Sequence, residues 1–415
     1  MNKPKNKNYK WYIMILGAVT NAVVIAMPMI ALSVLLPEIS ADLHLNLVQA
    51  GLLWGLVSFP MIITSLLAGR LSDRFSPKHI LIVNCLLVGL TGAGRGWMPN
   101  YPLLLTEVFL CGFFGPLVIV ANFKNVVIWF PANRQSFANG IMNLGMASGF
   151  FVGSLVSATF LSPALGGWRN VFIFYGVISI LFAIPWLFSR TAPTSTEPIK
   201  PAPKLISFKE TMGHLVKSRT IWLLALANMA LNGGAQGITG YMPLHLQDIG
   251  WQVADAGGVL AVYNLASMIV VLPFTFLSDR SMHAKRLILI GAALWSAAGI
   301  GILTFANGTG VWVGMMMAGS VRDGFIAVIL AYVVNEISHI GIEYAGIATG
   351  FVISLMGIGN LAAPPLGNSL AVGNGDTTPI FFWTILVILS AVCLLVAFGK
   401  KTIPSKGEIP SLEEV

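Results

Sequence analysis

The sequence contains twelve long apolar runs, and each is long enough to cross a lipid bilayer as a helix. Such a helix needs about 20 apolar residues, because the hydrocarbon core offers its backbone no water to bond with. Charged side chains make up 10% of the 415 residues, whereas they make up about 25% of a soluble domain. We therefore expect an all-α integral membrane protein with twelve transmembrane helices. The runs cover residues 11–36, 47–69, 79–98, 101–123, 135–161, 168–189, 219–243, 254–277, 286–305, 310–333, 344–370 and 379–399.

The positively charged residues fall mostly on one side of these predicted spans. If the N-terminus is cytoplasmic, the cytoplasmic segments hold 20 of the 24 Lys and Arg residues, and the others are Arg95, Lys124, Arg169 and Arg322. An excess of Lys and Arg in cytoplasmic loops is the usual rule for membrane proteins. The pattern predicts a multi-pass protein of the cell membrane with both termini in the cytoplasm.

The two halves of the chain share residues at a constant separation of 206 positions. Pro37 and Pro243 are separated by this offset, and Leu71–Arg74 repeats as Leu277–Arg280. We expect two parallel six-helix repeats, which suit alternating access around a central site. The predicted units are an N-terminal half at 1–190, a Pro-, Lys-, Ser- and Thr-rich cytoplasmic linker at 191–218, a C-terminal half at 219–399 and a cytoplasmic tail at 400–415.

A charged motif follows the second apolar run. It reads Gly69-Arg-Leu-Ser-Asp73-Arg74-Phe-Ser-Pro-Lys78, and it resembles the signature of the 2–3 loop in the major facilitator superfamily. The sequence departs from that signature at Ser76, where the family usually has a second glycine. The resemblance implies that Gly69 lets helix 2 pack closely and that Asp73, Arg74 and Lys78 form a cytoplasmic gate.

A degenerate second copy of the motif follows the eighth run and ends in Asp279 and Arg280. Thr275 stands where this copy would carry its glycine. The resemblance implies the twelve-helix fold of the superfamily, transport by alternating access and a second gate at Asp279 and Arg280. The alternative is that the basic residues of both copies only set the topology.

Two further segments bear on the branch of the superfamily. Gly167-Trp-Arg169 before the sixth run resembles an element common in many branches. In the fifth run, Phe150 follows Gly149, where the antiporter signature of drug exporters has Gly-Pro. This difference counts against a typical proton-driven drug exporter.

Ionisable residues inside the apolar runs are candidate functional residues, because an unpaired charge in the bilayer is costly. Glu107 lies in the fourth run, and Arg322 and Asp323 lie in the tenth. We expect Arg322 to contact an anionic substrate or to pair with Glu107, and Glu107 or Asp323 to carry a coupling proton. The alternatives are a structural Arg322–Asp323 ion pair and a Glu107 that opens to an outer vestibule. Arg95 and Lys124 lie near helix ends and are expected to reach the membrane interface.

Amide side chains form a stripe along the seventh run. Asn228, Asn232 and Gln236 recur at every fourth position, so they share one face of a helix. They could bind substrate or line a water path, or they could bond neighbouring helices. Asn21 in the first run is a similar candidate, and His245 is expected to be solvated at the outer end.

These residues favour a secondary transporter of a small organic anion, with a proton as the coupling ion. The alternatives are an exporter of hydrophobic drugs or metabolites and a membrane sensor with the same fold. Helices 2 and 8 lack a core arginine, which argues against a site of the nitrate-porter kind. No enzyme or nucleotide motif is present, the three cysteines lie in apolar runs, and no cofactor, metal site or nucleic-acid partner is expected. The expected partners are the substrate, the proton and membrane lipids, and the expected state is a monomer.

Overall fold

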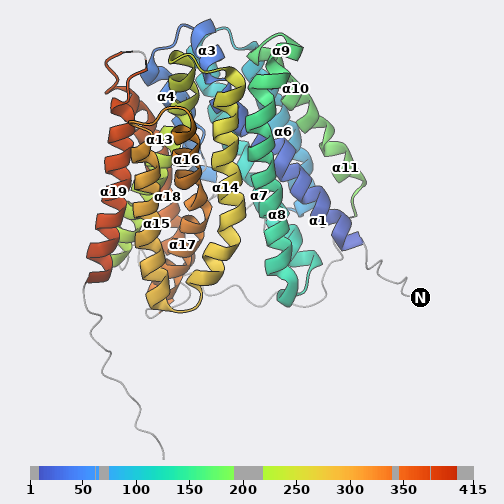
Figure 1. The fold of residues 1–415 in the computed structure, drawn as a ribbon. Coiled ribbons are helices and arrows are strands. Elements are labelled where there is room, and N and C mark those ends of the chain that lie inside the picture. Colours follow the sequence, from blue (N-terminus) through green and yellow to red (C-terminus); the bar gives the residue numbers. More distant parts are fainter. Residues whose placement is uncertain are drawn as a thin grey trace, which may run out of the picture.

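The computed structural model describes residues 9–60, 62–64, 74–190, 218–338, 345–373 and 375–399, and these residues form a bundle of long helices without strands (Figure 1). The first half comprises α1 (Tyr9–Thr20), the π-helical segment η1 (Asn21–Ala26), α2 (Met27–Val34), α3 (Leu36–Asp42), α4 (Leu47–Leu56), α6 (Pro77–Trp97), α7 (Tyr101–Trp129), α8 (Ala132–Val156), η2 (Ser157–Leu161), α9 (Ser162–Leu165), α10 (Trp168–Leu181) and α11 (Ala183–Phe188). The second half comprises α13 (Arg219–Asp248), α14 (Val253–Ser278), α15 (Met282–Ile302), α16 (Thr309–Ser320), α17 (Arg322–Ser338), α18 (Ala345–Asn368) and α19 (Thr378–Gly399).

Ten helices among the described residues are long and apolar enough to cross a membrane. The other two expected spans have separate explanations. The run at 47–69 is described only in part, as α4 and the short stretch that follows it. The run at 219–243 forms α13, which has 30 residues but carries the amide stripe and several glycines that lower its hydropathy. The prediction of an all-α membrane protein is confirmed.

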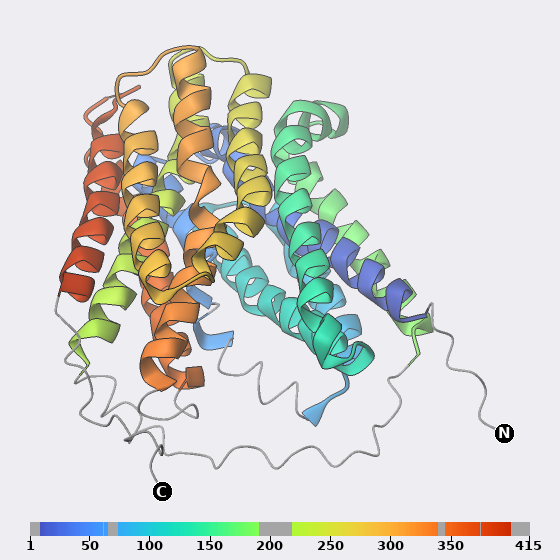
Figure 2. The same ribbon diagram turned by 60° about the horizontal axis from the view of Figure 1, so that its bottom comes forward.

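The helices divide into two bundles that follow the order of the chain. In Figure 1 most of the first half, including α1, α8, α10 and α11, lies to the right, the second half lies to the left, and α4 reaches across to the second half. Within the halves, α6 packs on α7 and α10, and α13 packs on α18 and α19. Helix α1 begins and α19 ends at the same end of the bundle (Figure 2). We call this the terminal end, and we call the opposite end, which carries α3 and α9, the α3 end.

Local sequence explains where several helices begin. Asn46 accepts a hydrogen bond from the Gln49 backbone N–H at 2.8 Å, and the Gln49 side chain accepts one from the Asn46 N–H at 3.0 Å. This reciprocal pair is a capping box, which satisfies two free backbone donors at the start of α4. The Asn100 side chain caps α7 with a single bond, which it accepts from the Leu103 N–H at 3.1 Å. Both caps lie at the α3 end, where the chain turns back into the bundle.

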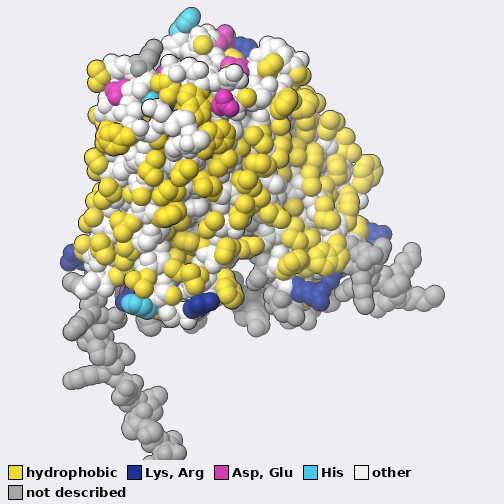
Figure 3. All heavy atoms as spheres, in the orientation of Figure 1, with side chains coloured by type: hydrophobic (Ala, Val, Ile, Leu, Met, Phe, Trp, Pro, Cys, Tyr) yellow, Lys and Arg dark blue, Asp and Glu magenta, His cyan; other side chains and the backbone are white. Residues whose placement is uncertain are grey.

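The side surface of the bundle is apolar. Figure 3 shows hydrophobic side chains over the middle of the molecule, with Lys and Arg near the terminal end and Asp and Glu near the α3 end. Large side chains such as Phe188 and Phe276 are 83% and 73% exposed on this surface. Water would not tolerate so large an apolar face, so this surface contacts lipid.

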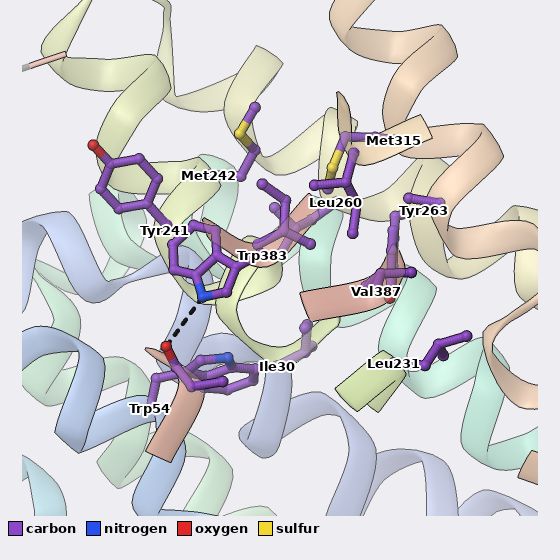
Figure 4. Close-up of a cluster of buried hydrophobic side chains, with 14 of the residues drawn as sticks. Ile30, Trp54, Leu231, Tyr241, Met242, Leu260, Tyr263, Met315, Trp383 and Val387 are labelled. Carbon is purple, nitrogen blue, oxygen red and sulfur yellow. Dashed lines mark hydrogen bonds between the residues drawn. The ribbon is translucent and has the colours of Figure 1, made fainter. Parts of the chain in front are cut away.

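The core joins the two halves. Ile30 and Trp54 from the first half belong to one cluster of buried side chains with residues of α13, α14 and α19. These include Leu231, Leu260 and Val387 (Figure 4). Protein interiors are closely packed, so the backbones of facing helices must approach each other closely. Small residues are therefore needed where the helices cross.

Glycines provide these crossings at positions related by the repeat. A Cβ atom on Gly51 of α4 would lie 2.8 Å from the backbone at Pro364 and Pro365 of α18. Its counterpart 206 residues later, Gly257 of α14, would place a Cβ 2.7 Å from the Ser154 carbonyl oxygen of α8. The halves therefore meet through two equivalent helix pairs, α4–α18 and α8–α14.

One hydrogen bond joins two residues that occupy equivalent positions in the two repeats. The Ser33 hydroxyl donates to the carbonyl oxygen of Thr239 at 2.6 Å, and these residues are 206 positions apart. Equivalent positions of two parallel repeats can only touch near the axis that relates them. The contact therefore confirms the two six-helix repeats of the predicted fold.

Several hydrogen bonds between the two halves lie toward the α3 end. Asn368 donates to the Leu47 carbonyl oxygen at 2.7 Å, next to the start of α4. Trp54 donates from its indole to the Gln236 carbonyl oxygen at 2.9 Å, about two turns further along. These bonds close the molecule at the α3 end.

Candidate substrate-binding cavity

A cavity of about 400 Å³ lies between the halves, about midway along the helices. Both halves contribute to its wall, which includes η1, α2, α4, α6, α7 and α8 on one side and α13, α14, α17 and α18 on the other. Ligand pockets of small molecules typically have volumes of about 300–1,000 Å³. The cavity is therefore large enough for one small organic molecule.

The two sides of the cavity differ in polarity. The first half contributes mostly apolar side chains, and its charged residue in the wall is Arg95. The second half contributes most of the polar groups, which are Asn232, Gln236, Thr239, Asn264, Arg322, Asp323 and Asn360. A ligand would thus meet hydrocarbon on one side and hydrogen-bonding groups on the other.

Arg322 and Asp323 form an ion pair in the cavity wall. Arg322 Nε lies 2.8 Å from Asp323 Oδ1, and Arg322 Nη2 lies 3.2 Å from Asp323 Oδ2. Two parallel bonds of this kind hold a carboxylate firmly in its ionised form. The expected pairing of Arg322 with Glu107 was wrong, because the adjacent carboxylate satisfies the guanidinium.

A break in the tenth span places this pair. Helix α16 ends at Ser320 and α17 begins at Arg322, with Val321 as a single residue between the two helices. The Asp323 backbone N–H donates to the Ser267 hydroxyl at 3.3 Å, which ties the start of α17 to α14. Arg322 also donates to Asn264 at 3.3 Å and lies 5.2 Å from the ring centre of Tyr263.

The expectation that Arg95 reaches the membrane interface was wrong. It is 3% exposed and lines the cavity, so it does not reach the membrane interface. Its guanidinium carbon lies 4.4 Å from the ring centre of Phe172. Its hydrogen bonds go to the carbonyl oxygens of Gly92 and Pro28, both at a long 3.4 Å. Helix α6 ends just after this residue, but α10 and α2 cover the side chain.

Glu107 lies beside Arg95 but outside the cavity wall. A Cβ atom on Gly94 would lie 2.9 to 3.1 Å from the carboxyl atoms of Glu107, so this carboxyl packs on the backbone of α6. The side chain is half-buried, and its Oε2 atom is buried without a hydrogen-bond partner. Arg95 is close enough for its charge to act on this carboxyl.

The amide stripe of α13 divides between the cavity and the helix itself. Asn232 and Gln236 line the cavity. Asn228 is fully buried and accepts a hydrogen bond from the Asn232 side chain at 2.9 Å, so it positions Asn232. Gln236 also bonds to the carbonyl oxygen of Trp54 at 3.4 Å, which links the stripe to the other half.

Two other predicted residues do not line the cavity. Asn21 accepts a hydrogen bond from Asn122 at 2.7 Å and donates to the Met142 carbonyl oxygen at 3.5 Å, so it joins helices within the first half. His245 is 5% exposed and stacks on the ring of Tyr241, so the expectation that it is solvated was wrong.

The predicted gate residues lie at the terminal end. Gly69 and Asp73 are outside the described residues. Arg74 is exposed, and Lys78 donates to the carbonyl oxygens of Leu187 and Ser189 at 2.8 and 2.6 Å, which caps α11 within the same half.

In the second copy of the motif, Asp279 pairs with Lys285 at 3.4 Å and Arg280 is exposed. Among the described residues, these contacts of Lys78 and Asp279 stay within one half each. The described part of the motif does not bridge the halves in this structure.

The Gly-Trp-Arg element connects neighbouring segments of the first half at the α3 end. Arg169 pairs with Asp42 at 2.8 Å and donates to the Met98 carbonyl oxygen at 2.6 Å, while Trp168 donates to the same carboxylate at 3.2 Å. These bonds join three loops at the α3 end, far along the helices from the cavity.

Four polar residues of the wall were not expected from the sequence, namely Ser58, Thr239, Asn264 and Asn360. The repeat offset contains a signal for them. Asn264 is the counterpart of Ser58, and Asn360 is the counterpart of Ser154, the residue that accepts a bond from Asn264 at 3.2 Å. Polar residues at equivalent positions of both halves mark the crossings beside the cavity.

Comparisons with known proteins agree with this architecture. The model of the Major Facilitator Superfamily matches residues 15–342 and 246–414. The chain is 22% identical to the multidrug resistance protein MdtG of Proteus mirabilis over 95% of this chain and 98% of that protein. It is 23% identical to the nitrite extrusion protein of Bacillus subtilis over 88% and 89% of the two chains.

Solved structures share the fold. The nucleoside transporter NupG has a TM-score of 0.76 at 15% identity, with 95% of this chain and all of that chain covered. A bacterial homologue of the lysosomal transporter Spinster has a TM-score of 0.72 at 16% identity, with 96% of each chain covered. The matched residues, the paired six-helix halves and the central cavity show a secondary transporter of small molecules, not an enzyme, and the chain belongs to the Major Facilitator Superfamily.

Proposed function

We propose that this protein moves a small organic anion together with a proton across the cell membrane by alternating access. The observation that carries this proposal is Arg95, a buried arginine in the wall of a cavity between the two halves that forms no salt bridge with a described carboxylate. A buried cation in the bilayer costs several kcal/mol unless it is paired or wetted, so such residues are kept where a substrate or ion pathway needs them.

The coupling proton is assigned to Glu107. Asp323 is bonded twice to Arg322, which stabilises its ionised form against protonation. Glu107 has one carboxyl oxygen buried without a partner, and the charged group near it is Arg95. A proton on that oxygen would remove the cost of an unpaired buried charge whenever Arg95 engages another anion.

The direction of the open side follows from charge. The Lys and Arg excess favours the terminal end as the cytoplasmic one, and the bonds of Asn368 to Leu47 and of Trp54 to Gln236 join the halves toward the opposite, α3 end. On this assignment the structure is closed to the outside. The exposed Arg74 and Arg280 fit a cytoplasmic gate whose contacts are broken in this state.

The names of several relatives support an anionic substrate. They include a sialic acid transporter of Escherichia coli, 23% identical over 89% of this chain, and a hexuronate transporter of Bacillus subtilis, 29% identical over 49% of it. The second candidate function is the export of hydrophobic compounds, which the apolar wall from the first half and the likeness to MdtG favour.

The decisive test uses the purified protein in proteoliposomes with an imposed proton gradient. We expect a pool of labelled organic anions to yield at least one that accumulates with the gradient, and Glu107→Gln to abolish accumulation but retain anion exchange. Asp255→Asn, an exposed carboxylate in the first turn of α14, is the matched control. Transport of lipophilic cations or neutral drugs, without transport of any anion, would support the second candidate instead.

A further inference from the structure

We infer that Arg95 binds the anionic group of the substrate and that the substrate is a monovalent anion with an apolar body. This inference rests on the proposed transport of an anion, and it names the class of anion and the residue that selects it. Sequence reasoning favoured Arg322 for this role, so the structure changes the assignment.

The balance of charge in the cavity points to Arg95. Arg322 and Asp323 are both in the wall and cancel each other at 2.8 Å. Arg322 has further contacts with Asn264 and Tyr263, so most of its donors are already directed into the protein. Its charge is therefore not available without breaking a buried ion pair, which is costly.

Arg95, unlike Arg322, has no carboxylate bonded to its guanidinium among the described residues. Its described hydrogen bonds reach backbone carbonyls at 3.4 Å, which is long for a charged donor. Its positive charge faces the cavity, and the nearby carboxyl of Glu107 packs on Gly94 outside the wall. A substrate anion in the cavity would gain strong charge-assisted bonds at Arg95, with Glu107 protonated in compensation.

The count of charges limits the substrate to a single negative charge. With Arg322 neutralised by Asp323, Arg95 is the one cation without a salt bridge among the described residues that line the cavity. A second negative charge on the ligand would lie in an apolar cavity without a partner, which is unfavourable.

The polarity of the cavity wall limits which chemical groups the rest of the substrate can carry. Around Arg95, the first half presents Val24, Ile25, Met29, Val88 and Val108 to the cavity. A sugar acid carries hydroxyl groups on all sides, and those that faced these five side chains would lose their water and find no acceptor on them. An aliphatic or aromatic body gains instead from burial at about 25 cal/mol per Å².

The test compares probes that differ in one property each. We use binding of 4-toluenesulfonate, which is monovalent and apolar, benzene-1,3-disulfonate, which is divalent, and glucuronate, which is monovalent and hydroxylated. Sulfonates stay ionised at every working pH, so loss of binding cannot reflect ligand protonation. Binding is read by calorimetry and by protection of the Cys111 thiol, which lines the cavity, against a labelling reagent.

We expect 4-toluenesulfonate to bind at least tenfold more tightly than either other probe. Arg95→Ala should weaken that binding by about 30-fold, the effect of removing a charged hydrogen bond, and Arg95→Lys should restore part of it. Lys124→Ala, a basic residue of the same half outside the cavity wall, is the matched control and should bind normally.

Tighter binding of the disulfonate or of glucuronate would overturn the inference while leaving anion transport intact. So would unchanged binding in Arg95→Ala. If Arg95→Ala does not fold, the order of the three probes on the unaltered protein still decides the question. If no anion binds or is transported, the proposed function itself fails.

Discussion

At the scale of single residues, the ion pair of Arg322 and Asp323 shows how a charge is kept inside the bilayer. Each partner removes the cost that the other would impose, and Asn264 and Ser267 bond the remaining groups. The pair is thus a structural part of the cavity wall, and its stability depends on both members being present.

Removing one partner should therefore destabilise the protein. We expect Asp323→Asn to lower the free energy of unfolding by about 3 kcal/mol, because Arg322 would stay charged and lose its partner. Thermal unfolding in detergent or nanodiscs measures the loss. The double variant Arg322→Met with Asp323→Leu should recover most of the stability, and a single variant as stable as the unaltered protein would contradict this account.

At the scale of elements, close helix crossings control the contact between the halves. Gly51 faces the backbone of α18 at a distance that no side chain fits. Gly291 in α15 has open space around its Cβ position. Both lie inside helices, so the same substitution carries a similar cost in helix propensity at each site.

We expect Gly51→Val to lower transport at least tenfold, because α4 and α18 could no longer approach and the α3 end could not close. Gly291→Val should transport normally. Uptake into proteoliposomes at equal protein content measures both. Normal transport by Gly51→Val would show that this crossing is not needed in the cycle.

The start of α19 offers a test of a loop carboxylate. Asp376 accepts hydrogen bonds from the backbone N–H groups of Val372 and Thr378, and these bonds hold the pKa of its carboxyl below the ordinary value of 3.8. A lowered pKa in the folded state adds stability above the unfolded pKa, and this stability is lost as the pH falls through the folded pKa.

We therefore expect Asp376→Asn to lower the unfolding temperature by a similar amount at every pH from about 5 to 8, since the carboxylate is ionised throughout. The difference should shrink only below about pH 4. Thermal unfolding at a series of pH values measures it. A difference that vanished near neutral pH would contradict the assigned contacts.

At the scale of the whole molecule, the two halves are closed at the α3 end and the cavity lies below that closure. Asn368 bonds to Leu47 across the halves in this state. Alternating access requires this contact to open once in every cycle.

A crosslink at this contact should arrest the cycle. We expect the double variant Leu47→Cys with Asn368→Cys, in a background lacking Cys85, Cys111 and Cys393, to lose transport on oxidation and to regain it on reduction. Each single cysteine variant is a control and should be insensitive to oxidant. Full transport by the oxidised, crosslinked protein would show that the α3 end does not need to open.

The architecture could be predicted from the sequence because the bilayer imposes it locally. Twenty apolar residues form a spanning helix whatever their neighbours are, and the constant offset of 206 positions exposes the repeat. The predicted run at 168–189 and the helices from Trp168 to Phe188 agree within a residue.

The site was only partly predictable, because it depends on which way each side chain faces and on what lies across from it. The sequence by itself determined that Arg322, Asp323, Asn232 and Gln236 lie in membrane helices, and the cavity contains all four. Only the tertiary structure decided that Arg322 is neutralised by its neighbour and that Arg95 is buried under α10 instead of reaching the interface. The physical reason is that the role of a charged side chain in the bilayer depends on which groups pair with it or cover it. Many of those groups come from helices far apart in the chain.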